Sequence, residues 1–212
     1  CEIALQVGPA SRLEAEVGLL SATAIALAFA GLRRGWIEAA WSTRIFTPLL
    51  VVLALASVVS QSHPFANFGW IAWPVAIAVH FGILRAFDLE GAPRTRDTLH
   101  VLGVLLVAGL GAVELHWLAT EYTAHHTAWS VAAAAFVPAW VMLVISMAAM
   151  DDRWPVSAAP IAHRTTANGV LVVCLVLWTV YANISHDGRS DPLPYLPLVN
   201  ALDLMQVMAG FA

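Results

Sequence analysis

Residues 128–150, AWSVAAAAFVPAWVMLVISMAAM, form an apolar run that contains no charged side chain. An α-helix needs roughly 20 such residues to cross the hydrocarbon core of a bilayer. Comparable runs recur along the chain at about residues 15–32, 46–62, 68–87, 99–119 and 167–184. The sequence therefore predicts an all-α fold, a polytopic transmembrane helix bundle with six spans.

A further apolar run occupies residues 198–212 at the end of the sequence. At about 1.5 Å per residue it is too short to cross a bilayer, so we expect a partial seventh span or an interfacial helix. No internal repeat or low-complexity linker separates the runs. Residues 1–212 are accordingly predicted to form a single transmembrane bundle that is part of a longer chain.

The composition excludes several classes of protein. Apolar residues make up 60% of the chain and charged residues 11%, and the mean hydropathy is +0.76. This leaves too little polar surface for a water-soluble globule. The net charge of −4 without a basic tract argues against nucleic-acid binding. The chain has no GxxxxGK[ST], GxGxxG or GxSxG motif, which argues against ATP-driven or serine-hydrolase chemistry and leaves enzyme status open.

The basic residues, all of them arginine, indicate an orientation. Most fall in the loops after the first, third and fifth spans: Arg33, Arg34, Arg44, Arg85, Arg94, Arg96, Arg153 and Arg164. The opposite side holds Arg12 and Arg189. By the positive-inside rule, the amino-terminal segment and the even-numbered loops lie outside the cytoplasm. We expect a multi-pass protein of the bacterial inner (plasma) membrane, with the lipid bilayer as its main partner.

Small residues in the first span recur every four positions and predict a close helix contact: Gly18, Ala22, Ala26 and Ala30. Such a stripe lets a neighbouring backbone approach closely, so it could also bind another membrane protein. The abundance of alanine offers a simpler explanation of the pattern.

The fourth span carries ionisable residues on one face. His100 and Glu114 differ by about 40° around a helix, and Gly103, Val107 and Gly111 lie between them on the same stripe. This face should point into the bundle, because a buried charge in hydrocarbon is costly. Glu114 could then be a protonated or paired functional carboxyl, or it could reach an aqueous vestibule without further role.

Histidines within the spans raise the question of haem. His116 lies about 160° from His100 around the helix, so this span cannot present two haem ligands on one face. His80 and His100 could together hold one haem, but a lone buried histidine bonded to a carbonyl is commoner. No cofactor is predicted.

Polar residues gather in the loops on the predicted outer side. The candidates for acid or base catalysis are Glu114, Glu121, His125, Asp187 and Asp191, and the candidates for substrate contact are His116, Trp117, Tyr122, Trp129 and Tyr195. The competing interpretation is a set of solvated loops that border the lipid headgroups. No HExxH or HxH string fixes a set of ligands, so no metal site is predicted.

The segment after the sixth span contains Pro192, Pro194 and Pro197, which forbid a regular helix. Asn200 and Asp203 follow, three positions apart, at the start of the last apolar run. An asparagine can accept from the first free amides of a helix, and an aspartate favours its positive end. We predict a helix cap here, with substrate contact as the alternative.

Residues 192–203, PLPYLPLVNALD, resemble a signature of a bacterial family of predicted membrane proteins, domain of unknown function 2339. Ala201 stands where the family signature has proline. The resemblance implies a carboxyl-proximal part of a long, many-spanning inner-membrane protein. It brings no catalytic residues and no activity.

Three functions are compatible with these features. The outer polar residues favour the handling of a polar, sugar-like cell-envelope substrate at an outward-facing site. Pro74 and Pro138 inside spans should bend their helices, which would suit a transporter with a midplane site. The small-residue stripe would suit a non-catalytic scaffold or accessory subunit of a membrane complex.

Overall fold

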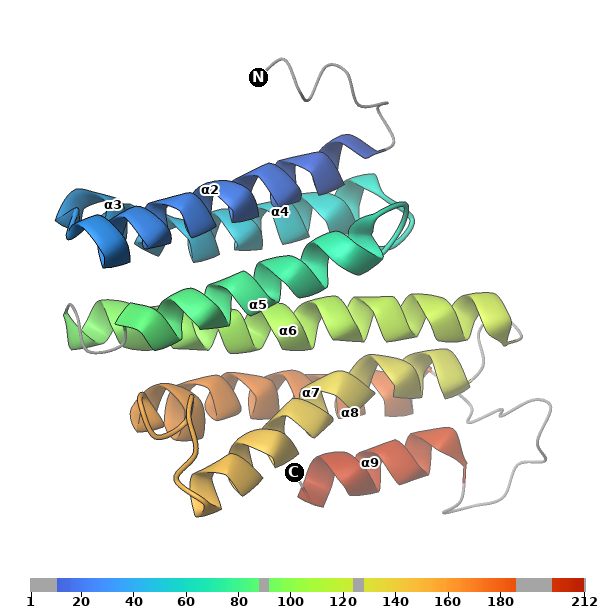
Figure 1. Ribbon diagram of the computed structural model, residues 1–212. Coiled ribbons are helices and arrows are strands. Elements are labelled where there is room, and N and C mark those ends of the chain that lie inside the picture. The colour runs from blue at the N-terminus through green and yellow to red at the C-terminus, as the bar shows by residue number, and fades with distance from the viewer. Residues whose placement is uncertain (1–10, 88–91, 124–127, 186–199, 212) are drawn as a thin grey trace. The chain divides into compact units, whose positions relative to one another are not determined.

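The structure is a computed structural model that describes residues 11–87, 92–123, 128–185 and 200–211. Every regular element in these ranges is helical (Figure 1). Six of the described helical segments are long and apolar enough to cross a membrane. A shorter apolar helix, α9 (Ala201–Phe211), occupies the seventh run. The prediction of an all-α fold with six spans and a shorter seventh helix is confirmed.

The chain separates into two compact units, residues 1–106 and 107–212. The first contains α2 (Arg12–Arg34), α3 (Ile37–Ser42), η2 (Thr43–Ile45), α4 (Phe46–Ser60), α5 (Gly69–Phe87) and the start of α6 (Pro93–Tyr122). The second contains the rest of α6, α7 (Ala128–Met150), η3 (Ile161–Ala167), α8 (Asn168–Ser185) and α9. That all of these helices form a single bundle stays a prediction.

Three spans, the second, the fourth and the sixth, begin six or more residues earlier than their hydropathy indicated, and the sixth begins at Ile161. The second runs without a break from Ile37 to Ser60 through α3, η2 and α4. The fourth begins at Pro93, a residue that suits the first turn of a helix because its missing N–H would have no partner there. All three extensions contain arginine and other polar residues, so apolar runs alone could not reveal them.

Local backbone chemistry explains where the first span ends, but it does not test the bends expected at two prolines. Helix α2 ends at Gly35, whose φ of 64° lies in the left-handed region that glycine adopts without a Cβ penalty. Pro74 and Pro138 lie inside the continuous helices α5 and α7. The bends expected at these prolines stay predictions.

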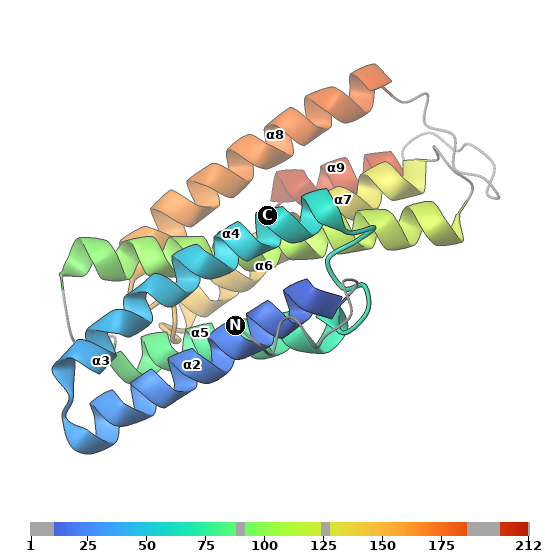
Figure 2. The same ribbon diagram turned by 90° about the horizontal axis from the view of Figure 1, so that it is seen from above.

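In the first unit, α2 packs against α3, α4 and α5 (Figures 1 and 2). The face of α2 that is buried consists of Glu14, Val17, Ser21, Ala24 and Ala28. The predicted small-residue stripe lies on another face, where Gly18, Ala22 and Ala26 are exposed. Burying Glu14 and Ser21 keeps their polar groups out of lipid, and this explains which face turns inwards. A contact through the stripe with a partner protein stays a prediction.

In the second unit, α7 packs against α8, η3 and α9. Its inward face is rich in alanine and includes Ala128, Ala132, Ala135 and Ala139, so helices approach closely there. By contrast, large apolar side chains on α8 point outwards: Val172, Val173, Val176, Leu177 and Val180. Exposed aliphatic surface of this extent suits contact with lipid.

Candidate functional site

The polar stripe of α6 is buried, as its spacing predicted. His100 is completely buried and Glu114 is 7% exposed. Within the first unit, Gly103 lies directly against the His80 ring, so that a Cβ at position 103 would overlap the imidazole. Within the second unit, a Cβ on Gly111 would come within 2.6 Å of Val137. The inward orientation is confirmed, whereas a functional role for Glu114 stays a prediction.

The residues predicted to gather on the outer side are only partly described. His125, Asp187, Asp191 and Tyr195 lie outside the described residues. The others belong to the second unit, where Trp117 and Trp129 are half-buried and Glu121 and Tyr122 are exposed. Whether the complete set forms one site stays a prediction.

His116 has a defined structural partner. Its Nδ1 lies 2.8 Å from the carbonyl oxygen of Ser130, in the first turn of α7. This contact fixes the imidazole ring at Ser130, the residue that follows Trp129 in the sequence. The carbonyl can only accept, so Nδ1 carries the proton. Over the described ranges, no group of three or more His, Cys, Asp and Glu side chains could hold a metal ion.

A polar groove that the sequence did not reveal lies in the first unit, where α2 begins and α4 ends. Its volume is about 590 Å³, within the roughly 300–1,000 Å³ typical of small-molecule sites. The polar residues that line it are Arg12, Glu16, Ser60, Gln61, Ser62 and Asn67. Asn67 has a φ of 52°, the left-handed conformation that asparagine tolerates better than most residues. We call this feature the Gln61 groove.

Beside the groove, the buried Glu14 and the half-buried Gln61 form a pair with spare acceptors. The Nε2 of Gln61 donates to Oε1 of Glu14 at 2.5 Å, and Glu14 is 5% exposed. The other oxygens, Oε2 of Glu14 and Oε1 of Gln61, are buried without a hydrogen-bond partner among the described residues. An unsatisfied buried acceptor costs about 1–3 kcal/mol. Both oxygens are closed off from solvent, so a ligand in the groove reaches them only when the side chain of Gln61, which lines the groove, turns.

The rim of the groove adds both hydrogen-bond donors and hydrogen-bond acceptors. The Nε of Arg12 donates to Oε1 of Glu16 at 3.0 Å, and both side chains remain open to solvent. Together with the serine and asparagine side chains, this ion pair offers donors and acceptors with no net charge of its own. Such a lining fits a neutral polar group better than a strongly charged one.

Sequence reasoning missed this site for an identifiable reason. Glu14 and Gln61 are 47 positions apart, and each sits at the edge of an apolar run where polar residues are ordinary. The available signal was Gln61 itself, because the amide falls inside the predicted second span, residues 46–62. An uncharged polar side chain in an apolar run requires a partner.

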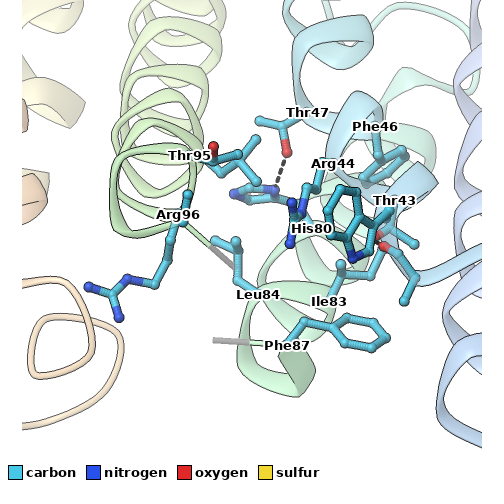
Figure 3. A pocket seen from close by; sticks show the side chains of 14 residues that line it. Thr43, Arg44, Phe46, Thr47, His80, Ile83, Leu84, Phe87, Thr95 and Arg96 are labelled. Atoms are coloured by element: carbon cyan, nitrogen blue, oxygen red, sulfur yellow. Dashed lines mark hydrogen bonds between the residues drawn. The ribbon is translucent and has the colours of Figure 1, made fainter. Parts of the chain in front are cut away.

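A second pocket, of about 40 Å³, lies at the other end of the spans of the first unit (Figure 3). Residues from the junction of α3 and α4, from the end of α5 and from the start of α6 line it. Its most deeply buried polar group is His80, which is 2% exposed. The Nδ1 of His80 lies 2.7 Å from the Thr47 hydroxyl, as the dashed line in Figure 3 marks.

These observations define a class of protein: a multi-pass helical membrane protein with polar side chains buried between its spans. A family model described as "Predicted membrane protein (DUF2339)" matches residues 7–212. The chain belongs to this family, as the resemblance in residues 192–203 implied. A search of curated proteins and a search of solved structures each found no match.

Proposed function

We propose that this protein handles a polar substrate of the bacterial cell envelope at the outward-facing side of the inner membrane, and that the Gln61 groove receives it. The sidedness follows from the arginines, which concentrate in the loops after the first, third and fifth spans. The groove lies at the opposite ends of the spans, beside the first residues of α2 and the loop after α4. On this placement it opens to the extracytoplasmic side.

The observation that carries the proposal is the buried pair of Glu14 and Gln61 with two oxygens that lack donors. A substrate hydroxyl that donates to either oxygen removes the cost of leaving it unsatisfied. The hydroxyls of Ser60 and Ser62 and the side chain of Asn67 supply further hydrogen bonds along the groove. A sugar-like group, with several hydroxyls and no charge, has the matching chemistry.

A chemical step on such a substrate would need an acid or a base in addition to the binding groove. Glu114 and Glu121 are the described candidates in the second unit. The other candidates for acid or base catalysis that the sequence predicts are His125, Asp187 and Asp191. The proposal for the groove is therefore one of binding alone, and catalysis by these residues is a separate prediction for the second unit.

The test is substitution in the full-length protein, expressed in a strain that lacks its own copy. Glu14→Gln keeps the size of the side chain but replaces an acceptor oxygen by a donor, so it should abolish rescue of the strain's sensitivity to cell-wall antibiotics and osmotic stress. Glu38→Gln is the matched control, because Glu38 is exposed on α3 at the other end of the spans. Immunoblots should give equal protein levels for both variants.

Two results would reject the proposal in different ways. A deletion strain that is no more sensitive than its parent to cell-wall antibiotics and osmotic stress would contradict a role in the envelope. Full rescue by Glu14→Gln, together with loss of rescue by Glu114→Gln or Glu121→Gln, would instead indicate that the substrate binds to the second unit.

A transporter with a midplane site is the second candidate, favoured by the histidine buried within the spans. Ionisable side chains inside a membrane often mark a route for protons or substrate, and His80 lies on α5 after Pro74. A cysteine in place of the buried Ala76, one turn before His80, should react with small polar thiol reagents if water reaches this depth. An unreactive cysteine would favour the outward-facing groove.

A further inference from the structure

Glu14 is a buried carboxyl group in the first turn of α2, and it is 5% exposed. Among the described residues its hydrogen-bond donor is Nε2 of Gln61, which lies 2.5 Å from Oε1, and its Oε2 has no partner. A carboxylate removed from water is costly unless a counter-charge or several hydrogen bonds compensate it. One amide donor leaves the charge unbalanced and most of the acceptor sites of the carboxylate unused.

The helices around Glu14 supply no counter-charge at this end of the first unit. Helix α4 contains no charged residue, and neither do residues 69–79 of α5, which packs along α2. On α2 itself, the Nε of Arg12 donates to Glu16 at 3.0 Å, and the Arg12 side chain is 64% exposed. The other arginines of α2 are in its last turn. A bound cation can therefore balance a charge that the described side chains leave unbalanced.

Gln61 provides a second buried oxygen without a donor. Its Oε1 has no hydrogen-bond partner among the described residues, while its Nε2 is used by Glu14. Gln61 is also the C-cap of α4, and the negative end of a helix dipole favours a cation near the last turn. Carboxylate and amide oxygens are the ligands that hard metal cations prefer. Two cation ligands thus come from the start of α2 and the end of α4, which lie side by side in Figures 1 and 2.

The amide of Gln61 can present either of its two ends to Glu14. With Nε2 toward the carboxylate, a hydrogen bond closes the pair. With Oε1 toward the carboxylate, two acceptors face one another, which is favourable only when a positive charge lies between them. Because Gln61 lines the groove, turning its side chain also connects Glu14 to the groove. The same movement therefore opens the site and creates its second ligand.

The charge of the pair selects a monovalent cation. Glu14 contributes one negative charge and Gln61 none, and Arg12 and Glu16 in the groove lining balance one another. A monovalent ion leaves the buried site neutral, whereas a divalent ion would leave one positive charge in it at the cost of desolvation. The groove of about 590 Å³ has room for waters that complete the coordination, since each water occupies roughly 30 Å³ in the liquid.

We propose that Glu14 and Gln61 bind an alkali-metal cation that enters through the Gln61 groove. The ion lies between one carboxylate oxygen of Glu14 and Oε1 of Gln61, and the second carboxylate oxygen remains for a substrate hydroxyl. The inference rests on the function proposed for the groove, in which the cation binds beside the polar substrate and holds Gln61 in its turned position.

The experiment uses the full-length protein in detergent, without substrate, and follows thermal unfolding while sodium chloride replaces choline chloride at constant ionic strength and pH. An ion that binds only the folded state raises the melting temperature. Sodium should do so, and choline, whose bulky quaternary ammonium group cannot enter between the two oxygens, should not. Glu14→Gln should remove the response to sodium. Without sodium this variant should melt at a temperature no lower than the unchanged protein, because an unbalanced buried charge has been removed.

Glu38→Gln is the matched control, since it makes the same change of charge at an exposed position of α3. This variant should keep the response to sodium. If Glu14→Gln does not fold, Gln61→Met takes its place, because methionine has a similar length but no amide oxygen. It should weaken the apparent affinity for sodium about tenfold or more. Equal stabilisation by potassium would support the site and show that it accepts alkali-metal cations in general.

Three results would overturn the proposal: equal stabilisation by choline, a response to sodium that Glu14→Gln retains, and a larger response to calcium that Glu14→Gln removes. The two proposals for the groove can fail separately, because no substrate is present in this measurement. Loss of rescue in Glu14→Gln without any response to sodium would reject the cation and keep the substrate. A response to sodium in a protein whose deletion leaves the envelope unaffected would keep the cation and reject the substrate.

Discussion

At the scale of single residues, the contact between Gly103 and His80 is the clearest example of a position that only one side chain fits. The absence of a Cβ lets α6 approach the buried imidazole directly. Sequence periodicity placed Gly103 on the same face as His100 and Glu114 and correctly predicted that this face is buried. The identity of the facing residue depends on how α5 is rotated, which no local pattern reports.

Gly103→Ala should lower the free energy of unfolding of the full chain by about 1–3 kcal/mol, because the added methyl group forces His80 or α6 to shift. Thermal unfolding in detergent measures this loss. Gly109→Ala on the same helix is the control, since a Cβ there meets nothing within 4 Å. The control should be neutral or stabilised by roughly 0.5–1 kcal/mol through helix propensity. Equal stability of the two variants would contradict the contact.

At the scale of elements, the start of α9 is the prediction that the structure confirms in most detail. The Oδ1 of Asn200 accepts from the backbone N–H of Leu202 at 2.8 Å and of Asp203 at 3.0 Å. The Nδ2 of Asn200 donates to Oδ2 of Asp203 at 2.7 Å, which closes the cap. Capping could be predicted because it joins residues three positions apart, whereas the early start of α6 could not, since its first turns are polar.

Asn200→Ala should destabilise α9 by about 0.5–2 kcal/mol, because two amides lose their acceptor. Hydrogen–deuterium exchange should be faster in residues 201–211 and unchanged in α8. Asn200→Ser, which keeps an acceptor oxygen, should restore most of the protection. Asn183→Ala is the control in α8, where the side chain donates only to the carbonyl oxygen of Thr179. Unchanged exchange at α9 in Asn200→Ala would show that the cap contributes little.

At the scale of the whole molecule, the arrangement of spans determines which loops share a side of the membrane. The Gln61 groove and the pocket beside His80 lie at opposite ends of α4 and α5. Orientation in the membrane therefore decides which of them meets the cell envelope. The arginine distribution predicts that the groove faces the outer side and the pocket beside His80 the inner side.

Cysteine labelling of intact cells tests this orientation. Ser62 and Ser157 are both exposed, in the loops after the second and fifth spans. In a chain whose own cysteines, Cys1 and Cys174, are replaced by alanine, Ser62→Cys should react with a membrane-impermeant maleimide. Ser157→Cys should react only after the membrane is permeabilised. The reverse pattern would invert the orientation and place the groove on the cytoplasmic side.

The amino-acid order alone was enough to predict the helical class, the approximate spans, the buried face of α6 and the cap of α9. Each of these is a property of residues that are close in the chain, because hydropathy, helical period and capping act over one helix or less. The Glu14–Gln61 pair and the Thr47–His80 pair were not predictable in this way, since their members are 47 and 33 positions apart. Which buried polar groups meet depends on the rotation and packing of whole helices, and this only the tertiary structure decides.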